Sequence, residues 1–421
     1  MARLRPPLVL LAALLGLAVI ARPDRTAAAT APSVITIGTL HAGSGPFAAI
    51  SMPTSLGLQL WVDRTNAAGG AYVKAFHKKI PLKLISYDDQ SSTALVATLT
   101  NQLITQDHVD LLVADQGSVL TSVAVPIARE HKMFLFNPGG TGAPLFSKDN
   151  PYIALLGGPA STIWPKYLAD FLNQAGPAHG LHRVAILYAT NDFTGTQAAS
   201  VRRFLTEAGK TKIVFDQGVP TATSNYTVLI NNLAATHPDA VLEFGYPGND
   251  IAFLRGLRDM GQHFPFVFTL YAGLETQELA KTVGIPGLTG VFSYVTGADY
   301  PYKVNTGLDL AQYRALWTKT YAHTPGAAFG ENAVIGYVVG EMLGQTLAHT
   351  DSLDQLALRK ALYSRSGRME TMAGPFKLDP TGAQIGEITP LGQVEPDAHG
   401  VPHLVVVWPK ALATGAPKIT R

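Results

Sequence analysis

Apolar, β-prone runs alternate with segments of helical periodicity along most of this chain. Strands are predicted at 34–39, 80–87, 110–114 and 133–136, and helices at 52–67, 93–107 and 118–131. Runs such as Leu111–Val113 and Met133–Phe136 are apolar on both faces, as parallel strands are when helices cover both sides of a sheet. The first part of the chain therefore predicts a doubly wound α/β unit.

The same rhythm restarts at about residue 160 without a detectable sequence repeat. Helices are predicted at 161–175, 195–208, 224–236 and 248–260, and strands at 183–188, 211–216, 239–244, 266–269 and 290–295. A chain of 421 residues is too long for one ordinary core, and 47% hydrophobic side chains suffice for two. We therefore expect two lobes.

The last third of the chain is divided between these lobes. Helical segments at 309–322, 329–349 and 353–364 have too few strands among them for a third sheet, so we expect them to pack on the first lobe. The apolar strand 404–408 is expected to join the second lobe. With crossings near 152–160, 290–297 and 374–386, lobe 1 is predicted at 31–155 plus 296–378, and lobe 2 at 156–295 plus 379–421.

Residues 1–30 have the pattern of a secretory signal peptide. Arg3 and Arg5 precede the apolar core Leu8–Ile20, and small residues follow at Ala27–Ala29. The core has about 13 residues, whereas a membrane-spanning helix needs about 20, so a retained anchor is the weaker alternative. The chain has no cysteine that a lipid could modify. We expect a monomer that is free in the periplasm.

Charge and motifs exclude several classes of function. Without the four arginines and one aspartate of residues 1–30, 28 basic and 29 acidic side chains remain, which predicts no surface for nucleic acid. The run Gly43–Ala48 matches a dinucleotide-binding fingerprint only weakly, because Pro46 removes a backbone donor that a pyrophosphate needs. His179 and His182 have no acidic cluster nearby. We therefore expect no catalytic residue, no metal and no cofactor.

Two adjacent acids, Asp88 and Asp89, end a predicted strand. They are candidates for paired catalytic acids, but we favour a role in capping the next helix, where Ser91 and Ser92 are also available.

Two loops after predicted strands suit a carboxylate ligand. Asp115–Val119 leads into a helix, and Asn137–Gly142 forms a glycine-rich turn. Both offer hydroxyl groups and free backbone N–H groups at the edge of the sheet where open α/β proteins bind ligands. Ordinary connecting turns are the alternative.

The opening of the mature chain resembles a known family. The segments Val34–Leu40, Ser44–Phe47, Asn66–Gly70 and Asp88–Ser91 resemble those of type I periplasmic solute-binding proteins, best known as the branched-chain amino-acid binders of ABC transporters. The resemblance extends over about 34–380. It implies two doubly wound Rossmann-like lobes joined by three crossover strands. It also implies a binding protein that delivers a small ligand to an ABC permease.

The resemblance implies contacts for the ligand carboxylate in the first lobe. The segment Gln116–Val119 is similar to the family's Gly-x-x-Ser-Ser-Ser segment and makes Ser118 a candidate. Asn137–Gly142 is similar to Ser-Pro-Gly-Ala-Thr-Asn and adds Gly140 and Thr141. The aromatic residue of the first loop corresponds to Phe47.

In the second lobe the resemblance implies Phe193 and Tyr246 as aromatic neighbours of the ligand, and Tyr271 where amino-acid binders keep an acid for the ammonium group. An ammonium group without that acid would be desolvated and unpaired. We therefore expect a carboxylate without an amino group, aromatic or branched, unless Glu275 or Glu243 replaces the acid. Each aromatic residue can instead belong to the core.

Two other functions remain open from the sequence. One is a ligand-sensing periplasmic receptor or regulator with the same fold. The other is an exported α/β enzyme, for which the sequence provides no nucleophile and base in suitable loops.

Overall fold

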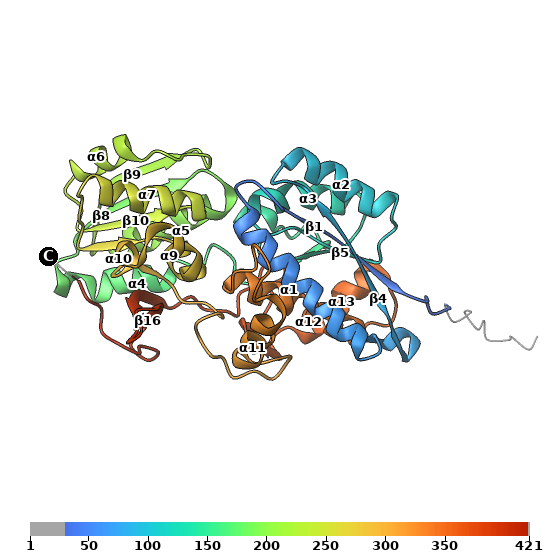
Figure 1. Ribbon diagram of the computed structural model, residues 1–421. Coiled ribbons are helices and arrows are strands. Elements are labelled where there is room, and N and C mark those ends of the chain that lie inside the picture. The colour runs from blue at the N-terminus through green and yellow to red at the C-terminus, as the bar shows by residue number, and fades with distance from the viewer. Residues whose placement is uncertain (1–29, 420–421) are drawn as a thin grey trace, which may run out of the picture. The chain divides into compact units, whose positions relative to one another are not determined.

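The computed structural model describes residues 30–419 (Figure 1). The predicted signal peptide, apart from its last residue, lies outside the described residues. Residues from Ser33 onward form one compact unit, to which the following description applies.

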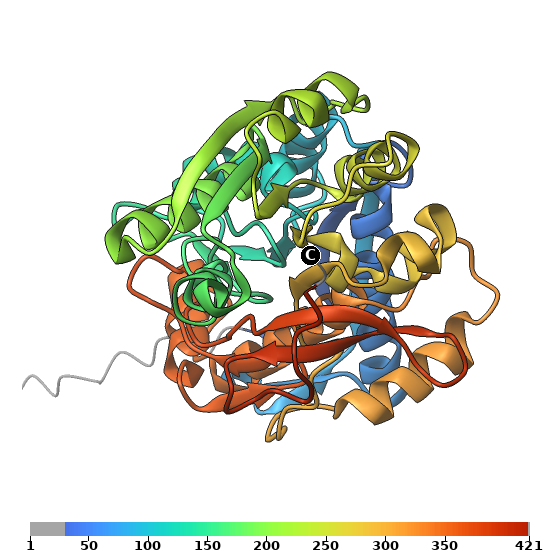
Figure 2. The same ribbon diagram turned by 90° about the vertical axis from the view of Figure 1, so that its left-hand side faces the viewer.

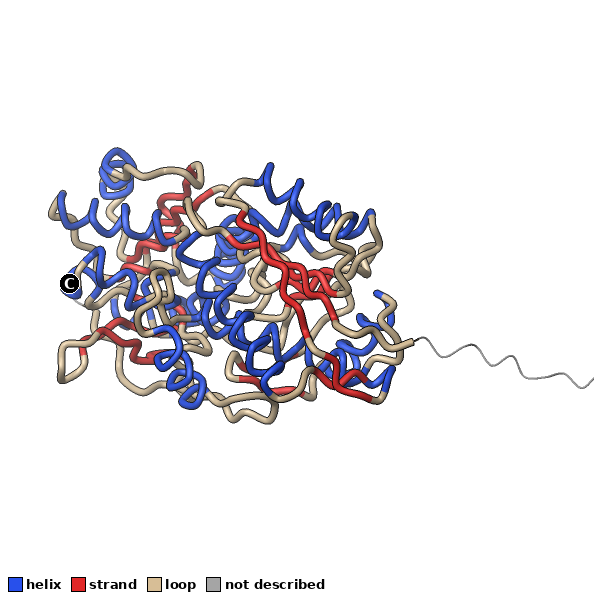
Figure 3. Tube along the Cα trace, turned by 45° about the vertical axis from the view of Figure 1, so that its right-hand side comes forward, coloured by secondary structure: helices blue, strands red, loops and turns tan. Residues whose placement is uncertain are grey.

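The first sheet has five parallel strands in the order β4-β1-β5-β6-β7. Helices flank it, as the tube in Figure 3 shows. The predicted strands and helices of this region are present, with ends shifted by a few residues. The elements are β1 (Ile35–His41), α1 (Ala48–Ala67), β4 (Leu82–Asp88), α2 (Thr93–Thr105), β5 (Leu111–Val113), α3 (Ser118–Glu130), β6 (Leu135–Asn137) and β7 (Ile153–Leu155).

The second sheet has seven strands in the order β16-β15-β12-β11-β10-β8-β9. Strands β9, β8, β10, β11 and β12 are parallel, and β15 and β16 are antiparallel additions at one edge, drawn in red in Figure 2. The strands are β8 (Arg183–Ala189), β9 (Lys212–Val219), β10 (Ala240–Phe244), β11 (Phe266–Phe268), β12 (Phe292–Tyr294), β15 (Leu391–Pro396) and β16 (Pro402–Trp408). The helices are α4 (Lys166–Gln174), α5 (Asp192–Ala208), α6 (Thr227–Ala234), α7 (Pro247–Asp259), α8 (Tyr271–Leu274), α9 (Thr276–Val283) and α10 (Ile285–Leu288). The predicted doubly wound lobes are therefore confirmed.

Helices α11 (Leu310–Tyr321), α12 (Glu331–His349) and α13 (Gln355–Arg365) lie in sequence between β12 and β15 of the second sheet. The buried helix α12 packs closely on α1 of the first lobe (Figure 1). Glycines permit this approach, because a Cβ atom on Gly336 would lie 2.0 Å from the carbonyl oxygen of Thr54. One on Gly57 would lie 2.7 Å from the backbone nitrogen of Tyr337.

Three segments connect the lobes and lie side by side. The N–H of Leu155 donates to the carbonyl of Gly382 at 2.8 Å. The N–H of Val295 donates to the carbonyl of Pro390, also at 2.8 Å. The last connection follows the hairpin of β13 (Met369–Thr371) and β14 (Gly374–Phe376). We call these connections, residues 156–160, 295–298 and 382–390, the hinge segments.

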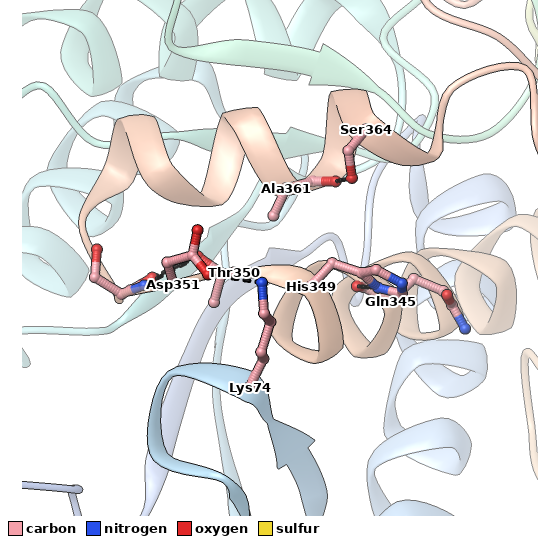
Figure 4. Close-up of polar contacts among 8 residues, drawn as sticks. Lys74, Gln345, His349, Thr350, Asp351, Ala361 and Ser364 are labelled. Atoms are coloured by element: carbon pink, nitrogen blue, oxygen red, sulfur yellow. Dashed lines mark hydrogen bonds and ion pairs between the residues drawn. The ribbon is translucent and has the colours of Figure 1, made fainter.

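A surface hairpin of β2 (Ala71–Val73) and β3 (Lys78–Ile80) was not predicted. Its turn is linked to the end of α12 by an ion pair of 2.7 Å between Lys74 and Asp351 (Figure 4). Both side chains are about half exposed or more, so the pair adds little stability. In the part of the chain from 30 to 419, no helix has the length and apolar character needed to cross a membrane.

Candidate ligand-binding site

A small cavity lies between the lobes, where loops leave the carboxyl ends of strands in both sheets. It encloses about 20 Å³, roughly the space that one water molecule requires. Its lining residues come from both lobes and from a hinge segment. They are Ile50, Gln116, Gly117, Gly139, Thr141, Gly157, Gly158, Trp164, Phe193, Tyr246, Tyr271, Leu274, Glu331, Asn332 and Ile335.

The N-terminus of α3 faces this cavity. Gly117 precedes the helix with a φ of 94°, a conformation that favours glycine. The hydroxyl of Tyr246, from the other lobe, lies 3.4 Å from the position of a Cβ atom on Gly117. Burial raises the pKa of Tyr246, and the N–H groups of Val119 and Ser118 oppose that rise. No hydrogen bond of ordinary geometry reaches this hydroxyl among the described residues. The hydroxyl of one lobe thus faces the first N–H groups of a helix of the other lobe, which have no partner within that helix.

The predicted residues of the first lobe differ in their positions. Thr141 lines the cavity, and its hydroxyl lies 2.7 Å from that of Ser161. Ser118 does not line it; its hydroxyl accepts a hydrogen bond of 3.0 Å from the N–H of Gly142. Gly140 is also behind the wall, where the Asn137 side chain bonds both its N–H and its carbonyl at 2.7 Å. Ser118 and Gly140 thus fix the loop that carries Thr141.

The predicted aromatic residues of the second lobe, Phe193, Tyr246 and Tyr271, line the cavity. The Phe193 and Tyr246 rings are 5.6 Å apart, and those of Tyr246 and Tyr271 are 6.2 Å apart. Phe47 does not line the cavity but packs edge-on against Tyr246 at 5.1 Å. Trp164 was not predicted from the sequence. Its ring packs edge-on against that of Phe193, with ring centroids 5.5 Å apart.

Acids near the cavity were only partly anticipated. Glu331, which was not predicted, lines it, and its Oε2 accepts a hydrogen bond of 3.2 Å from the N–H of Ala298 in a hinge segment. Burial raises the pKa of Glu331 to about 7. Glu275 is buried behind Leu274 and bonds to Asn332. Glu243 lies inside β10 and does not line the cavity.

A pair of buried acids lies behind the loops of each lobe. In lobe 1, Asp115 accepts a hydrogen bond from Ser51 at 2.5 Å, and burial followed by the charge of Asp89 raises its pKa well above the usual value. In lobe 2, Asp250 accepts one from the N–H of Tyr271 at 2.7 Å. Burial raises the pKa of Asp250 to about 6 and that of Glu243 well above its usual value. Asp115 also accepts a hydrogen bond of 2.6 Å from the N–H of Gln116, so one acid of each pair orients a residue of the cavity wall.

The interpretation of Asp88 and Asp89 as helix caps is wrong. The hydroxyl of Ser92 caps α2 by accepting from the N–H of Leu95. Asp88 instead accepts from the N–H of Gly43 at 2.8 Å, and Asp89 from the N–H of Ser91 at 2.9 Å. Both acids stabilise turns at the edge of the sheet, because the chain makes a further turn before α2 begins.

Histidines form no metal centre in the described part of the chain. Residues 30–419 contain no group of three or more His, Cys, Asp or Glu side chains arranged to hold a metal ion. His179 stacks on Phe171 with ring centroids 6.5 Å apart.

Comparison with known proteins identifies similar sequences. The sequence model of the periplasmic binding protein family matches residues 34–399. Leu/Ile/Val-binding protein homolog 7 of Brucella abortus is 22% identical over 399 residues, which cover 92% of this chain and 94% of that protein. Leu/Ile/Val-binding protein homolog 8 of Brucella suis is 24% identical over 348 residues, which cover 80% of this chain and 81% of that protein.

Solved structures share the fold. The substrate-binding protein LivJ of Streptococcus pneumoniae, in complex with isoleucine, has a TM-score of 0.71 at 19% identity and covers 89% of this chain and 99% of its own. A solute-binding protein of an ABC transporter from R. palustris, in complex with benzoate, has a TM-score of 0.70 at 17% identity. The match covers 89% of this chain and 96% of that protein.

Proposed function

Because the chain belongs to the periplasmic binding protein family, we propose that it is an exported monomer that captures a small carboxylate-bearing ligand between its lobes and delivers it to an ABC importer. The family is one of binding proteins, so the chain is a binding protein and not an enzyme. The structural similarity to LivJ and to the benzoate-binding protein supports a ligand site between the lobes.

One observation carries the proposal for a carboxylate: hydrogen-bond donors converge at one end of the cavity. The first N–H groups of α3, a helix of 13 residues, face the hydroxyl of Tyr246. The hydroxyl of Thr141 lies in the same wall and can donate while it accepts from Ser161. Unpaired N–H groups and the helix dipole favour a negative charge at this position. In this account Ser118, Gly140 and Phe47 support the residues that touch the ligand.

The rest of the cavity suits an aromatic or branched group without a positive charge. Trp164, Phe193 and Tyr271 present large apolar surfaces there. The phenol of Tyr271 can donate a hydrogen bond but cannot neutralise an ammonium group at neutral pH. Glu331 is already bonded to a hinge segment. We therefore propose that carboxylates without an amino group bind better than the corresponding amino acids.

Binding requires the lobes to move. A cavity of about 20 Å³ holds neither an amino acid nor an aromatic acid, so a ligand enters only when the lobes separate. The hinge segments are where such rotation takes place. Lobe 1 then comprises 31–155 plus 296–378 and lobe 2 comprises 156–295 plus 379–421. The closed shape is what the permease recognises.

A thermal-shift screen tests this function. Refolded, ligand-stripped protein is heated with a panel of carboxylates that includes benzoate and phenylpropanoate. A ligand at about 100 times its dissociation constant adds about 2.7 kcal/mol to the stability. Replacing Thr141, whose hydroxyl lines the cavity, by Ala should then weaken binding by about 1.5–3 kcal/mol, the contribution of one hydrogen bond to a charged group. If no carboxylate raises the melting temperature, the proposed ligand class is wrong.

A further inference from the structure

Glu275 is a buried acid of the second lobe that reaches the first. It lies between α8 and α9, and only 2% of it is exposed. Its Oε1 accepts hydrogen bonds from the side-chain amide of Asn332 and, at 3.4 Å, from the Asn332 N–H in the first turn of α12. A Cβ atom on Gly330 would lie 2.2 Å from its Oε2, so glycine is needed there. A carboxyl group of one lobe thus caps a helix that packs on the other.

The contact continues from Asn332 to the ligand cavity. Nε2 of Gln116 donates to Oδ1 of Asn332 at 2.6 Å, and both side chains line the cavity. Gln116 directly precedes Gly117 and the N-terminus of α3. The position of a cavity residue of lobe 1 therefore depends on a side chain of lobe 2.

We propose that Glu275 is a latch between the lobes: in the closed molecule it holds Asn332 and, through it, Gln116, and it releases both when the lobes separate. Glu275 is a positioning residue, because it does not itself line the cavity. This inference goes beyond the proposed function, since a latch sets the balance of open and closed molecules without ligand. Only the effect of the latch on the affinity for a ligand rests on the proposed function.

The latch makes closure sensitive to pH. Burial raises the pKa of Glu275 to about 8 in the closed molecule, hydrogen bonds from Asn332 lower it, and the charges of Glu331 and Glu278 raise it. Tyr271 also faces Glu275, and burial keeps its phenol neutral by raising its pKa. In the open molecule Glu275 meets water, and its pKa returns toward about 4.3. Between about pH 4.3 and about pH 8 the closed form therefore binds an additional proton, and its population falls as pH rises across this range.

Distance measurements between two spin labels test the latch without any ligand. The chain has no cysteine, so Thr98→Cys on α2 and Val228→Cys on α6 place one label at an exposed site of each lobe. Glu275→Ala should lower the ratio of closed to open molecules about tenfold, because hydrogen bonds to the carboxyl group are lost. Glu275→Gln keeps the acceptor oxygen, so it should retain the closed population and lose the pH dependence between about 4.3 and about 8.

Matched variants separate the latch from a general effect on folding. Glu278→Ala removes a neighbouring acid that pairs with Lys281 at the surface at 2.9 Å, and it should leave the distances unchanged. Asn332→Ala breaks the same contact from the other lobe and should reproduce the opening even if Glu275→Ala does not fold.

Equal closed populations in the wild type and in the variants that fold among Glu275→Ala and Asn332→Ala would overturn the latch. A pH dependence that survives in Glu275→Gln would also overturn it. Titration of the wild type with benzoate keeps this question apart from ligand binding. If the latch fails while benzoate binds, the proposed function stands. If the latch holds while no carboxylate binds, the proposed function alone is lost.

Discussion

The proposed carboxylate site depends most on a single atom, the hydroxyl of Tyr246. It is buried, directed at the N-terminus of α3 and without a hydrogen-bond partner among residues 30–419. We predict that Tyr246→Phe weakens benzoate binding about tenfold to a hundredfold, since a hydrogen bond to a charged group contributes about 1.5–3 kcal/mol. Calorimetric titration measures this loss.

Tyr226→Phe is the matched control for that change. Tyr226 is a buried tyrosine of the same lobe and does not line the cavity. Its hydroxyl lies 3.4 Å from Oε1 of Glu243. Its replacement should leave the affinity for benzoate unchanged. Equal affinities in the wild type and in both variants would contradict a donor role for Tyr246.

Single residues of the site were predictable only where a local motif marked them. Thr141 and Tyr246 follow strands in loops that resemble family segments, and they line the cavity. Trp164 and Glu331 are far apart in sequence and precede or begin helices, so no local pattern linked them to the cavity. The resemblance also placed Ser118 among the ligand contacts, whereas packing gives its hydroxyl to the N–H of Gly142.

At the scale of elements, the turn before α3 lies close to Tyr246 of the other lobe. Gly117 has a φ of 94°, and a Cβ atom there would lie 3.3 Å from Ile50 and 3.4 Å from the hydroxyl of Tyr246. We predict that Gly117→Ala lowers the stability by about 1 kcal/mol or more and also weakens benzoate binding. Urea unfolding and calorimetry measure the two effects separately.

Gly209→Ala provides the comparison for that variant. Gly209 ends α5 with a φ of 61°, and nothing lies within 4 Å of a Cβ atom there. It should lower the stability by about 1 kcal/mol and leave the affinity unchanged. If Gly117→Ala also left the affinity unchanged, this turn would have no part in the ligand site.

The junction of β10 and α7 should make stability depend on pH. Burial raises the pKa of Asp250 to about 6, so the folded protein keeps a proton that the unfolded chain releases above about 4. The free energy of unfolding should therefore fall as pH rises from about 4 to about 6. Asp250→Asn should reduce this slope by removing one of the two acids, as urea midpoints across that pH range would show. An unchanged slope would mean that Asp250 titrates normally.

Most elements were predictable because long amphipathic or apolar segments have a clear period. The elements that were not predicted have no such period. Helices α8 and α10 have four residues each, too few for a helical period, and α9 has eight. Strand β15 begins with Leu391-Gly392 and ends at Pro396, residues that weaken the pattern of a strand. The helix predicted at 161–175 begins only at Lys166, after Pro165.

At the scale of the molecule, the alternation of strands and helices predicted two lobes, and the resemblance predicted three crossings. The path of the chain agrees with both predictions. Strands β7 and β12 end where the first two hinge segments begin, and β15 begins where the third hinge segment ends. The contact of Glu275 with α12 was not predictable. It joins residues that are 57 positions apart and lie in different lobes.

The central claim is that the interlobe cavity binds a carboxylate and lacks a partner for an amino group. Calorimetric titration of refolded, ligand-stripped protein with phenylpropanoate and with phenylalanine tests it most directly, because these ligands differ only in the ammonium group. We predict one site per chain and a clear preference for phenylpropanoate, since an ammonium group at Tyr271 would remain unpaired. A preference for phenylalanine would contradict the account and assign Glu331 or Glu275 to the ammonium group.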